Sequence, residues 1–296
     1  MRDVPFADLH AHSHFSFLDG ASSPEDMVAR AAELGLQALA LVDHDGLPGA
    51  VRFARAARDQ GVATVLGAEL TLGLEPGHEQ ASITPMTTAA RTGVPDPVGE
   101  HLLVLVRDET GYRQLSAHIA RAHLDSRTKG APRYRLEELS RTARQGHWQI
   151  LTGCRKGAVT RAAAAQLARG DLEGAAHAAA QQIERLLDLY GTGNVAVELL
   201  VGDGPLGDEL HDALVQGASL VREDRGLDEL TLPVLATTGA HYARPEERRL
   251  ADVHSALRAG VPLSQADPYL STRTAHLRSG EEMLRILPRY PHAVAQ

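Results

Sequence analysis

Short, continuous apolar runs, each followed by a polar tip and then by a helix-like stretch, most constrain how this chain can fold. Residues 38–42 and 62–66 are such runs; the first leads into Asp-His-Asp-Gly at 43–46 and the second into Gly-Ala-Glu at 67–69. A strand without polar alternation is buried on both faces, as in parallel sheets that helices cover. The repeated order of strand, polar tip and helix predicts βαβ units and a parallel sheet.

The same alternation continues along most of the 296 residues, a length that suits a single (β/α) barrel. Strands are predicted at residues 6–9, 38–42, 62–66, 101–106, 149–152, 194–199 and 232–237. Helices are predicted at residues 23–34, 47–60, 110–126, 161–190 (two helices interrupted at Gly170), 206–225, 246–259 and 279–287. Residues 74–100 are rich in Gly, Pro and Thr and have no periodicity, so they are predicted to form a long loop insertion.

The stretch after the first predicted strand is unusually rich in metal-ligating side chains. Within thirteen residues it places Asp8, His10, His12, His14 and Asp19. Residues two apart in an extended strand point to the same side, so His10 and His12 can present their imidazoles to one ion. Imidazole is the commonest transition-metal ligand, and a carboxylate supplies negative charge. A His-x-His pair alone is as often two exposed strand histidines, so the interpretation depends on the rest of the chain.

Other polar side chains also lie next to predicted strands. His44, Glu69, Cys154 and His241 follow strands, whereas His101 begins one. In a parallel barrel the carboxyl ends of the strands converge on one face, where such enzymes build their sites. This placement predicts one shared metal site.

Each of these residues also has a simpler interpretation. Cys154 could be an inert buried thiol, His101 a core histidine, and Glu69 the partner of an arginine. Asp43 is expected to orient His44 from outside the metal site, and Asp45 to belong to a turn. The histidines on predicted helices are expected at the surface: His118, His123, His177, His211 and His254.

Composition limits the classes of function. The formal net charge is −8, so the chain lacks the broad basic surface of a protein that holds nucleic acid by counterion release. The single cysteine excludes an intramolecular disulfide and suits a reducing cytoplasm. The N-terminus has no signal-peptide core, and no apolar run approaches membrane-spanning length. We therefore expect a soluble, cytoplasmic protein that does not contact a membrane.

Taken together, the motifs resemble those of a known family. Residues 8–13 (DLHAHS), 17–21 (FLDGA), 38–46 (ALALVDHDG), 67–69 (GAE), 151–154 (LTGC) and 236–242 (ATTGAHY) carry the resemblance. They resemble the polymerase-and-histidinol-phosphatase (PHP) domain at the N-terminus of bacterial C-family DNA polymerases, which include the DNA polymerase III alpha subunit and its error-prone relative. Residues 17–22 are most similar to the error-prone branch, and the resemblance runs from residue 6 to about residue 293.

The resemblance implies one PHP domain over residues 1–296, folded as a distorted, TIM-like (β/α)7 barrel. It also implies one to three divalent ions, zinc or manganese, held by up to nine ligands. Eight of those positions match residues here: His10, His12, Asp19, His44, Glu69, His101, Cys154 and His241. The ninth is Gly239, where the family pattern Asp-x-His has a carboxylate. This departure favours a one- or two-metal site over the full cluster.

The resemblance implies a metal-dependent phosphoesterase or 3′ to 5′ exonuclease. Divalent ions would supply a hydroxide nucleophile from a bound water, so no side chain is assigned as a separate catalytic group. An alternative of another class is a catalytically impaired domain with a structural or partner-binding role, favoured by Gly239 and by the low basic charge. A stand-alone PHP phosphatase is a further alternative. An amidohydrolase-like barrel is disfavoured, because no strand-end lysine is available to bridge two metals.

The resemblance also bears on polymerisation and on partners. The palm, fingers and thumb of the polymerase are not found in this sequence, so the chain is not expected to synthesise DNA. The expected partners are DNA, reached through the parent polymerase, and replisome or translesion subunits. The oligomeric state is left open.

Overall fold

The computed structural model describes residues 4–73, 99–126, 131–202, 207–270 and 274–295. The loop insertion predicted at 74–100 falls almost wholly on residues 74–98, which lie outside the described residues. Glu100 is already part of a strand.

Within the described residues, seven strands form one sheet in the order of the chain. They are β1 (Ala7–Asp8), β2 (Ala38–Leu41), β3 (Ala63–Leu72), β4 (Glu100–Val106), β5 (Trp148–Leu151), β6 (Val195–Leu200) and β7 (Val234–Thr237). A parallel bridge between Ala11 and Ala240 links the segment after β1 to the segment after β7, and the His12 backbone N–H donates to Ala240 O at 2.7 Å. The sheet is therefore a nearly closed seven-stranded barrel, which confirms the predicted fold class.

The prediction of a wholly parallel sheet was wrong at β4, which runs antiparallel to both β3 and β5. A parallel neighbour requires a crossover, usually a helix, and residues 74–100 show no helical periodicity. Because of the reversal, the start of β4 lies beside the end of β3, and His101 pairs with Thr71. His101 thus reaches the same end of the barrel as the residues that follow the parallel strands.

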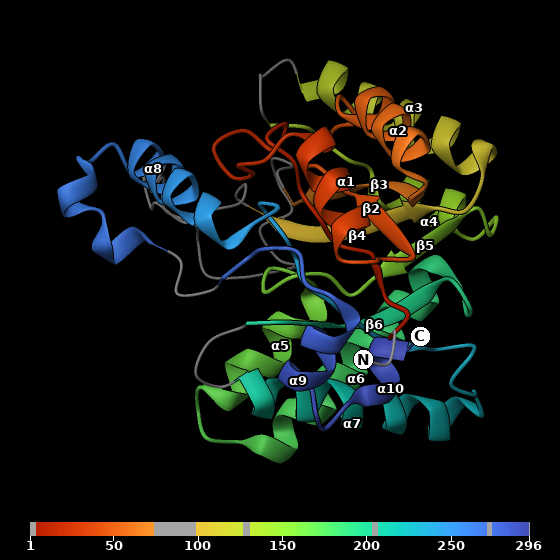
Figure 1. Cartoon of the computed structure of the whole chain (residues 1–296). Coiled ribbons are helices and arrows are strands. Elements are labelled where there is room, and N and C mark those ends of the chain that lie inside the picture. Colours follow the sequence, from red (N-terminus) through yellow and green to blue (C-terminus); the bar gives the residue numbers. More distant parts are fainter. Residues whose placement is uncertain (1–3, 74–98, 127–130, 203–206, 271–273, 296) are drawn as a thin grey trace.

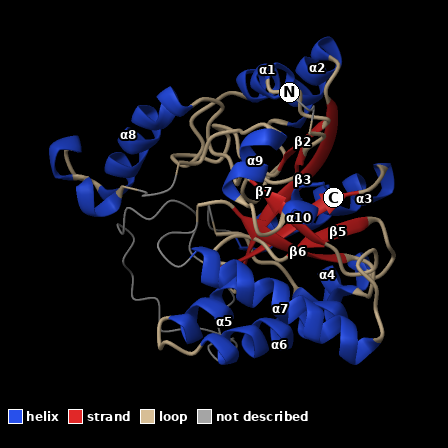
Figure 2. Ribbon diagram, turned by 60° about the horizontal axis from the view of Figure 1, so that its bottom comes forward, coloured by secondary structure: helices blue, strands red, loops and turns tan. Residues whose placement is uncertain are grey.

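Helices cover the barrel on two sides. Their bounds are α1 (Pro24–Glu33), α2 (Ala50–Gln60), α3 (Glu109–Ser126), α4 (Leu136–Ala143), α5 (Ala158–Leu167), α6 (Leu172–Tyr190), α7 (Gly207–Arg225), α8 (Arg248–Ala259), α9 (Gly280–Ile286) and α10 (Pro291–Ala295), with short 3₁₀ turns η1 (Pro245–Glu247), η2 (Leu263–Gln265) and η3 (Asp267–Tyr269). Figure 1 shows α1 to α3 on one side and α5 to α7 on the other, and α4 packs beside α6, where Ser140 Oγ donates to the Leu189 carbonyl oxygen at 2.6 Å. In Figure 2, α8 stands apart from both groups.

Local sequence explains several of the helix ends. Ser23 caps α1 by accepting a hydrogen bond from the Asp26 N–H, and the capping box predicted at Ser279 and Glu282 begins α9. The predicted break at Gly170 separates α5 from α6. α4 was not predicted, because little of its sequence is apolar and only two of its residues are buried.

The strands have two buried faces, which accounts for their continuous apolar runs. The face turned away from the barrel axis packs against the helices in the larger core cluster, which includes Trp148 and Ile150. A separate, small cluster includes Leu103, Leu105 and Ala196. Because alternate residues of a strand share a face, His101 lies on the face of Leu103 and Leu105, and the site sits above this inner cluster.

Candidate metal centre

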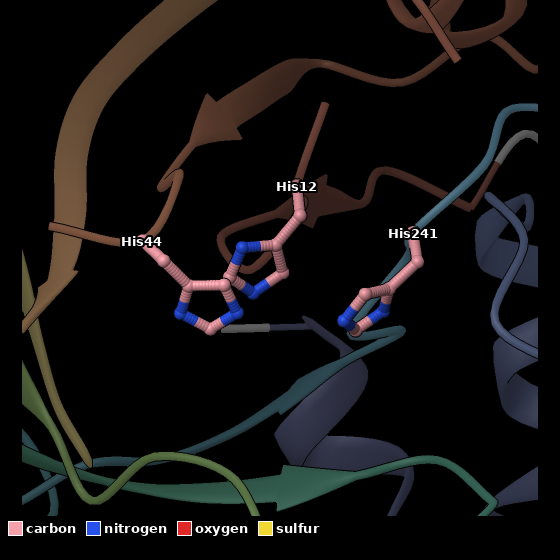
Figure 3. Close-up of side chains that lie close together, drawn as sticks. All are labelled: His12, His44 and His241. Atoms are coloured by element: carbon pink, nitrogen blue, oxygen red, sulfur yellow. The ribbon is translucent and has the colours of Figure 1, made fainter. Parts of the chain in front are cut away.

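The eight residues predicted as metal ligands come together at one end of the barrel. They lie after β1, β2, β5 and β7, within β3, and at the start of β4: His10, His12, Asp19, His44, Glu69, His101, Cys154 and His241. Figure 3 shows His12, His44 and His241 with their rings turned toward one another. The His12 ring centroid lies 4.5 Å from that of His44 and 4.7 Å from that of His241.

Glu69 is at the centre of this arrangement. Its Oε2 lies 3.1 Å from His101 Nδ1 and 3.3 Å from His44 Nδ1. The same oxygen is 3.6 Å from His12 Nε2, and Oε1 is 3.9 Å from His10 Nε2. One buried carboxylate therefore faces four imidazoles, and it belongs to two of the three groups of side chains close enough to share an ion.

Asp19 is the second buried carboxylate. Its Oδ2 lies 3.0 Å from both His44 Nε2 and His241 Nε2. The tight loop that carries it depends on Gly20, because a Cβ there would lie 1.9 Å from the Ser13 carbonyl oxygen. Asp19 therefore joins the segment after β1 to the segments after β2 and β7.

Cys154 lies at the edge of the cluster. Its Sγ is 3.4 Å from His101 Nδ1, and its residue exposure is 8%. Cys154 therefore lies beside another of the predicted ligands, and its role as a metal ligand stays a prediction.

The electrostatics of the centre separate charged from neutral histidines. Burial by itself would raise the pKa of Glu69, but the histidines around it, His101 first, hold that pKa well below its usual range. Burial would lower the pKa of His101, but Glu69 and Cys154 raise it well above its ordinary value. In the same way, Asp19 and Glu69 raise the pKa of His44 against the effect of burial. The two carboxylates thus favour the protonated forms of His44 and His101.

His12 behaves in the opposite way. Burial, and then electrostatic repulsion from the neighbouring imidazoles, His44 first, hold the pKa of His12 well below the ordinary value. His12 is therefore neutral, which is the form that coordinates metal ions.

Unsatisfied polar atoms test whether a metal ion suits this centre. Asp19 Oδ1 and Glu69 Oε1 are both buried and have no hydrogen-bond partner among the described residues. A buried, unpaired carboxylate oxygen is costly, and a cation beside it would remove that cost. Imidazole, carboxylate and thiolate are donors that suit zinc, and the first two also suit manganese. The residues present fit a divalent metal ion.

Two contacts fix which histidine nitrogens face the centre. His10 Nδ1 lies 2.7 Å from Glu198 Oε1, an oxygen that also accepts a hydrogen bond from the Thr237 hydroxyl. His241 Nδ1 donates to the Gly239 carbonyl oxygen at 2.8 Å. In both residues Nε2 is therefore the nitrogen that can coordinate an ion, because the partner of Nδ1 fixes the tautomer.

Asp43 supports the loop that carries the first histidines. It accepts hydrogen bonds from Ser13 N–H at 2.7 Å, Ser13 Oγ at 2.8 Å and Ser16 Oγ at 2.7 Å. Ser16 Oγ in turn accepts the His44 backbone N–H at 3.2 Å. Asp43 thus acts on His44 through Ser16. Asp45 lies in the expected turn, with φ at 50°, and binds Thr71 on β3.

Gly239 adds no side chain where the family pattern has a carboxylate, and its φ of 53° lies in the left-handed region.

The structure also adds two residues that the sequence interpretation missed. Glu198 is 1% exposed within β6, and Arg258 on α8 lies 3.6 Å from Asp19. Glu198 could have been recognised as a site residue, because it is the single carboxylate inside an apolar strand. Nothing in the sequence around Arg258 indicates that it lies near the site. His211, expected at the surface, is buried and donates to the Leu200 carbonyl oxygen at 3.0 Å, because this face of α7 packs on the barrel.

Comparison with known proteins shows the family of the chain. The family model of the PHP domain matches residues 8–200. The error-prone DNA polymerase of Nocardia farcinica is 45% identical over 317 residues, which cover 99% of this chain and 26% of the relative. That of Mycolicibacterium paratuberculosis is 48% identical over 292 residues, covering 98% and 24%. The chain spans about a quarter of the length of these curated relatives.

Among solved structures, a proposed metal-dependent phosphoesterase from Bifidobacterium adolescentis is 19% identical, covers 96% of both chains and has a TM-score of 0.33. Within the described residues, no helix has the length and apolar character needed to cross a membrane. The match of the family model, together with the motifs that converge on one end of the barrel, assigns the chain: it belongs to the PHP domain family.

Proposed function

We propose that the chain is a metal-dependent phosphoesterase that acts on DNA ends as part of an error-prone DNA polymerase. The observation that carries the proposal is the buried cluster in which Glu69 faces four imidazoles. Within the part of the chain that the structure describes, Oε1 of Glu69 and Oδ1 of Asp19 have no hydrogen-bond partner. The nature of the curated relatives supports DNA as the substrate. A metal-dependent 3′ to 5′ exonuclease is the activity that would serve such a polymerase.

Divalent ions bound here would supply a nucleophile at neutral pH and neutralise charge on the phosphodiester under attack. The chain's own residues prepare for them. Glu198 holds the His10 ring with Nε2 toward the centre, and the Gly239 carbonyl does the same for His241. Glu69 and Asp19 supply the negative charge that the ions need, and burial keeps both carboxylates away from bulk water.

The side chains of the centre are graded in exposure, which indicates where a substrate enters. The His10 and His12 side chains are each 1% exposed, whereas His44 is 6% and His241 is 11% exposed. A phosphodiester therefore meets the centre from the side of His44, His241 and Asp19.

We propose one or two bound ions, zinc or manganese. Gly239 withholds a carboxylate, so a third ion would have less of its charge compensated. A thiolate at Cys154 favours zinc over manganese at the neighbouring position. Metal binding must displace the protons held on His44 and His101, so the affinity for metal should rise with pH.

A second candidate is a retired site that stabilises a larger polymerase and contacts replisome or translesion subunits. Two observations favour it: Gly239 removes a ligand, and the neighbouring carboxylates raise the pKa of His44 and His101, so protons compete with a metal ion for these imidazoles. In both candidates the chain would belong to a bacterial DNA polymerase in the cytoplasm, and only the first candidate cleaves DNA.

The test is elemental analysis of the purified chain, followed by hydrolysis of a 3′-recessed DNA duplex with the same samples. The variant His12→Ala removes a buried imidazole, and His177→Ala, an exposed histidine on α6, is the control. Bound metal and DNA cleavage that are both lost in His12→Ala and kept in His177→Ala support the phosphoesterase. Absence of metal and of cleavage in the unmodified chain would support the retired site.

A further inference from the structure

The last turn of α8 reaches the candidate metal centre, although the helix stands apart from the others (Figure 2). Arg258 Nη2 lies 3.6 Å from Asp19 Oδ1, the carboxylate oxygen for which the described residues offer no hydrogen-bond partner. Its side chain is 19% exposed, compared with 3% for Asp19. A guanidinium therefore lies at the boundary between the buried ligands and solvent.

The orientation of α8 is set by its two faces. Leu257 is 61% exposed and Val253 is 37% exposed, so these residues turn outward. His254, one turn before Arg258, has a buried Nδ1 without a hydrogen-bond partner among the described residues, and the charge of Asp19 acts on it. Residues four apart lie on one face of a helix, so His254 and Arg258 share the face directed at the centre.

The position of Arg258 coincides with the side from which a phosphodiester must enter. His241 and His44 are the more exposed ligands, and Asp19 contacts both of them as well as Arg258. A guanidinium presents its N–H donors in a planar fork that matches two phosphate oxygens, and it stays charged at any physiological pH. In contrast, an arginine needed only to neutralise Asp19 would be redundant, because His44 and His241 already contact that carboxylate.

We propose that Arg258 binds the phosphate group of the substrate at the mouth of the metal centre and holds it toward the ions. This inference rests on the proposed phosphoesterase function and adds the residue that recognises the anion. It also gives α8 a role: the helix carries a substrate contact and does not cover the barrel. No metal ligand comes from α8 in this assignment.

The test measures binding separately from turnover. The full chain is loaded with Mn²⁺ and titrated with inorganic phosphate, and binding is followed by calorimetry and by broadening of the ³¹P resonance. The variants are Arg258→Ala and Arg258→Lys. Arg249→Ala is the matched control, because Arg249 is an exposed arginine on the same helix. Metal stoichiometry is measured on every sample.

If Arg258 contacts phosphate, Arg258→Ala should bind phosphate about 10- to 100-fold more weakly, which is the range for loss of a hydrogen bond to a charged group. Arg258→Lys should recover part of the affinity, and Arg249→Ala should match the unmodified chain. Metal content should be equal in all four proteins. In addition, KM for a 3′-recessed DNA should rise more than kcat falls.

Three results would overturn the inference. Unchanged phosphate affinity in Arg258→Ala with normal metal content would show that the arginine does not contact the anion, while the proposed function would stand. Reduced metal content in Arg258→Ala would show that it acts through Asp19 on the metal site. A chain that binds no metal would refute the proposed function, and the role of Arg258 with it.

Discussion

Replacing Asp8 by asparagine should stabilise the metal-free protein at neutral pH. Asp8 is 0% exposed and lies under the centre, where it accepts hydrogen bonds from the backbone N–H groups of His10 at 3.4 Å and Thr238 at 3.2 Å. Burial raises the pKa of this carboxyl to about 6, against the opposing effect of its bonds to Thr238. The Thr238 hydroxyl, which donates to Asp8, can instead accept from an asparagine amide, so the substitution preserves shape and bonding.

The sign and size of the effect follow from linkage. A carboxyl whose pKa is higher in the fold than in the unfolded chain contributes stability below its unfolded pKa, and this contribution is lost as pH rises through the folded value. The window therefore runs from pH 3.8 to about 6. The difference of about 2.2 pH units corresponds to about 3 kcal/mol of free energy of unfolding. Asp8→Asn should be more stable than the unmodified protein by up to this amount at pH 8, and the gain should vanish near pH 4.

The assay is urea unfolding in the presence of a chelator, followed by the fluorescence of the buried Trp148, at several values of pH between 4 and 8. Asp59→Asn, at an exposed position on α2, controls for the change in net charge. Protonation of other groups affects all three proteins equally, so it cancels in the difference between them. A stability difference between Asp8→Asn and the unmodified protein that is the same at pH 5 and pH 8 would refute the reasoning, because it would mean that hydrogen bonds fully compensate the buried charge.

Three further predictions concern single residues. Gly239→Asp should raise the number of bound ions, whereas Gly239→Asn should not. Each variant should lose about 1 kcal/mol of stability, because a side chain at this position must adopt the left-handed backbone. Elemental analysis measures the bound ions and urea unfolding measures the stability; equal metal content in the two variants would contradict the role of the carboxylate. Glu198→Gln should weaken metal binding about 10- to 100-fold by loosening the His10 ring; competition with a chromophoric chelator measures this, and an unchanged affinity would argue against it. Burial lowers the pKa of His276 to about 4, so this side chain takes up a proton less readily in the folded protein than in the unfolded chain. The free energy of unfolding should therefore decrease as pH falls from 6.5 toward 4. In urea unfolding curves this decrease should be smaller in His276→Asn and unchanged in His177→Asn, which alters an exposed site.

The strands could be predicted from local patterns, whereas the full set of eight ligands was predicted from the family resemblance. An apolar run such as residues 38–42 is short and ends in a polar turn, which favours a buried strand, and the polar tip is carried to the end of the barrel. The convergence of side chains that follow parallel strands, such as His44 and His241, comes from that rule, but the arrival of His101 at the same end does not. Whether the eight bind metal stays a prediction.

The direction of β4 could not be read from its own residues, since a fully apolar strand has the same pattern in both directions. The relevant signal was the sequence of residues 74–100, which has no helical periodicity and so does not predict the crossover helix that a parallel neighbour needs. Glu198 and Arg258 were missed for different reasons. Glu198 lies inside an apolar strand and could have been found as Glu69 was, as a carboxylate carried by a buried strand. The position of Arg258 depends on how α8 packs, and the sequence of α8 does not predict that packing.

The seam between the segments after β1 and β7 has a consequence for how the chain folds during synthesis. Ala11 pairs with Ala240, and Asp19 contacts His241, so the first ligands made must wait for almost the whole chain before their partners emerge. Closure across so long a separation is slow, because the entropy of the intervening chain is lost before any contact forms. A nascent chain without β7 would lack His241 beside His12 and Asp19. Under the proposed function, the metal centre is therefore completed only after β7 has been made.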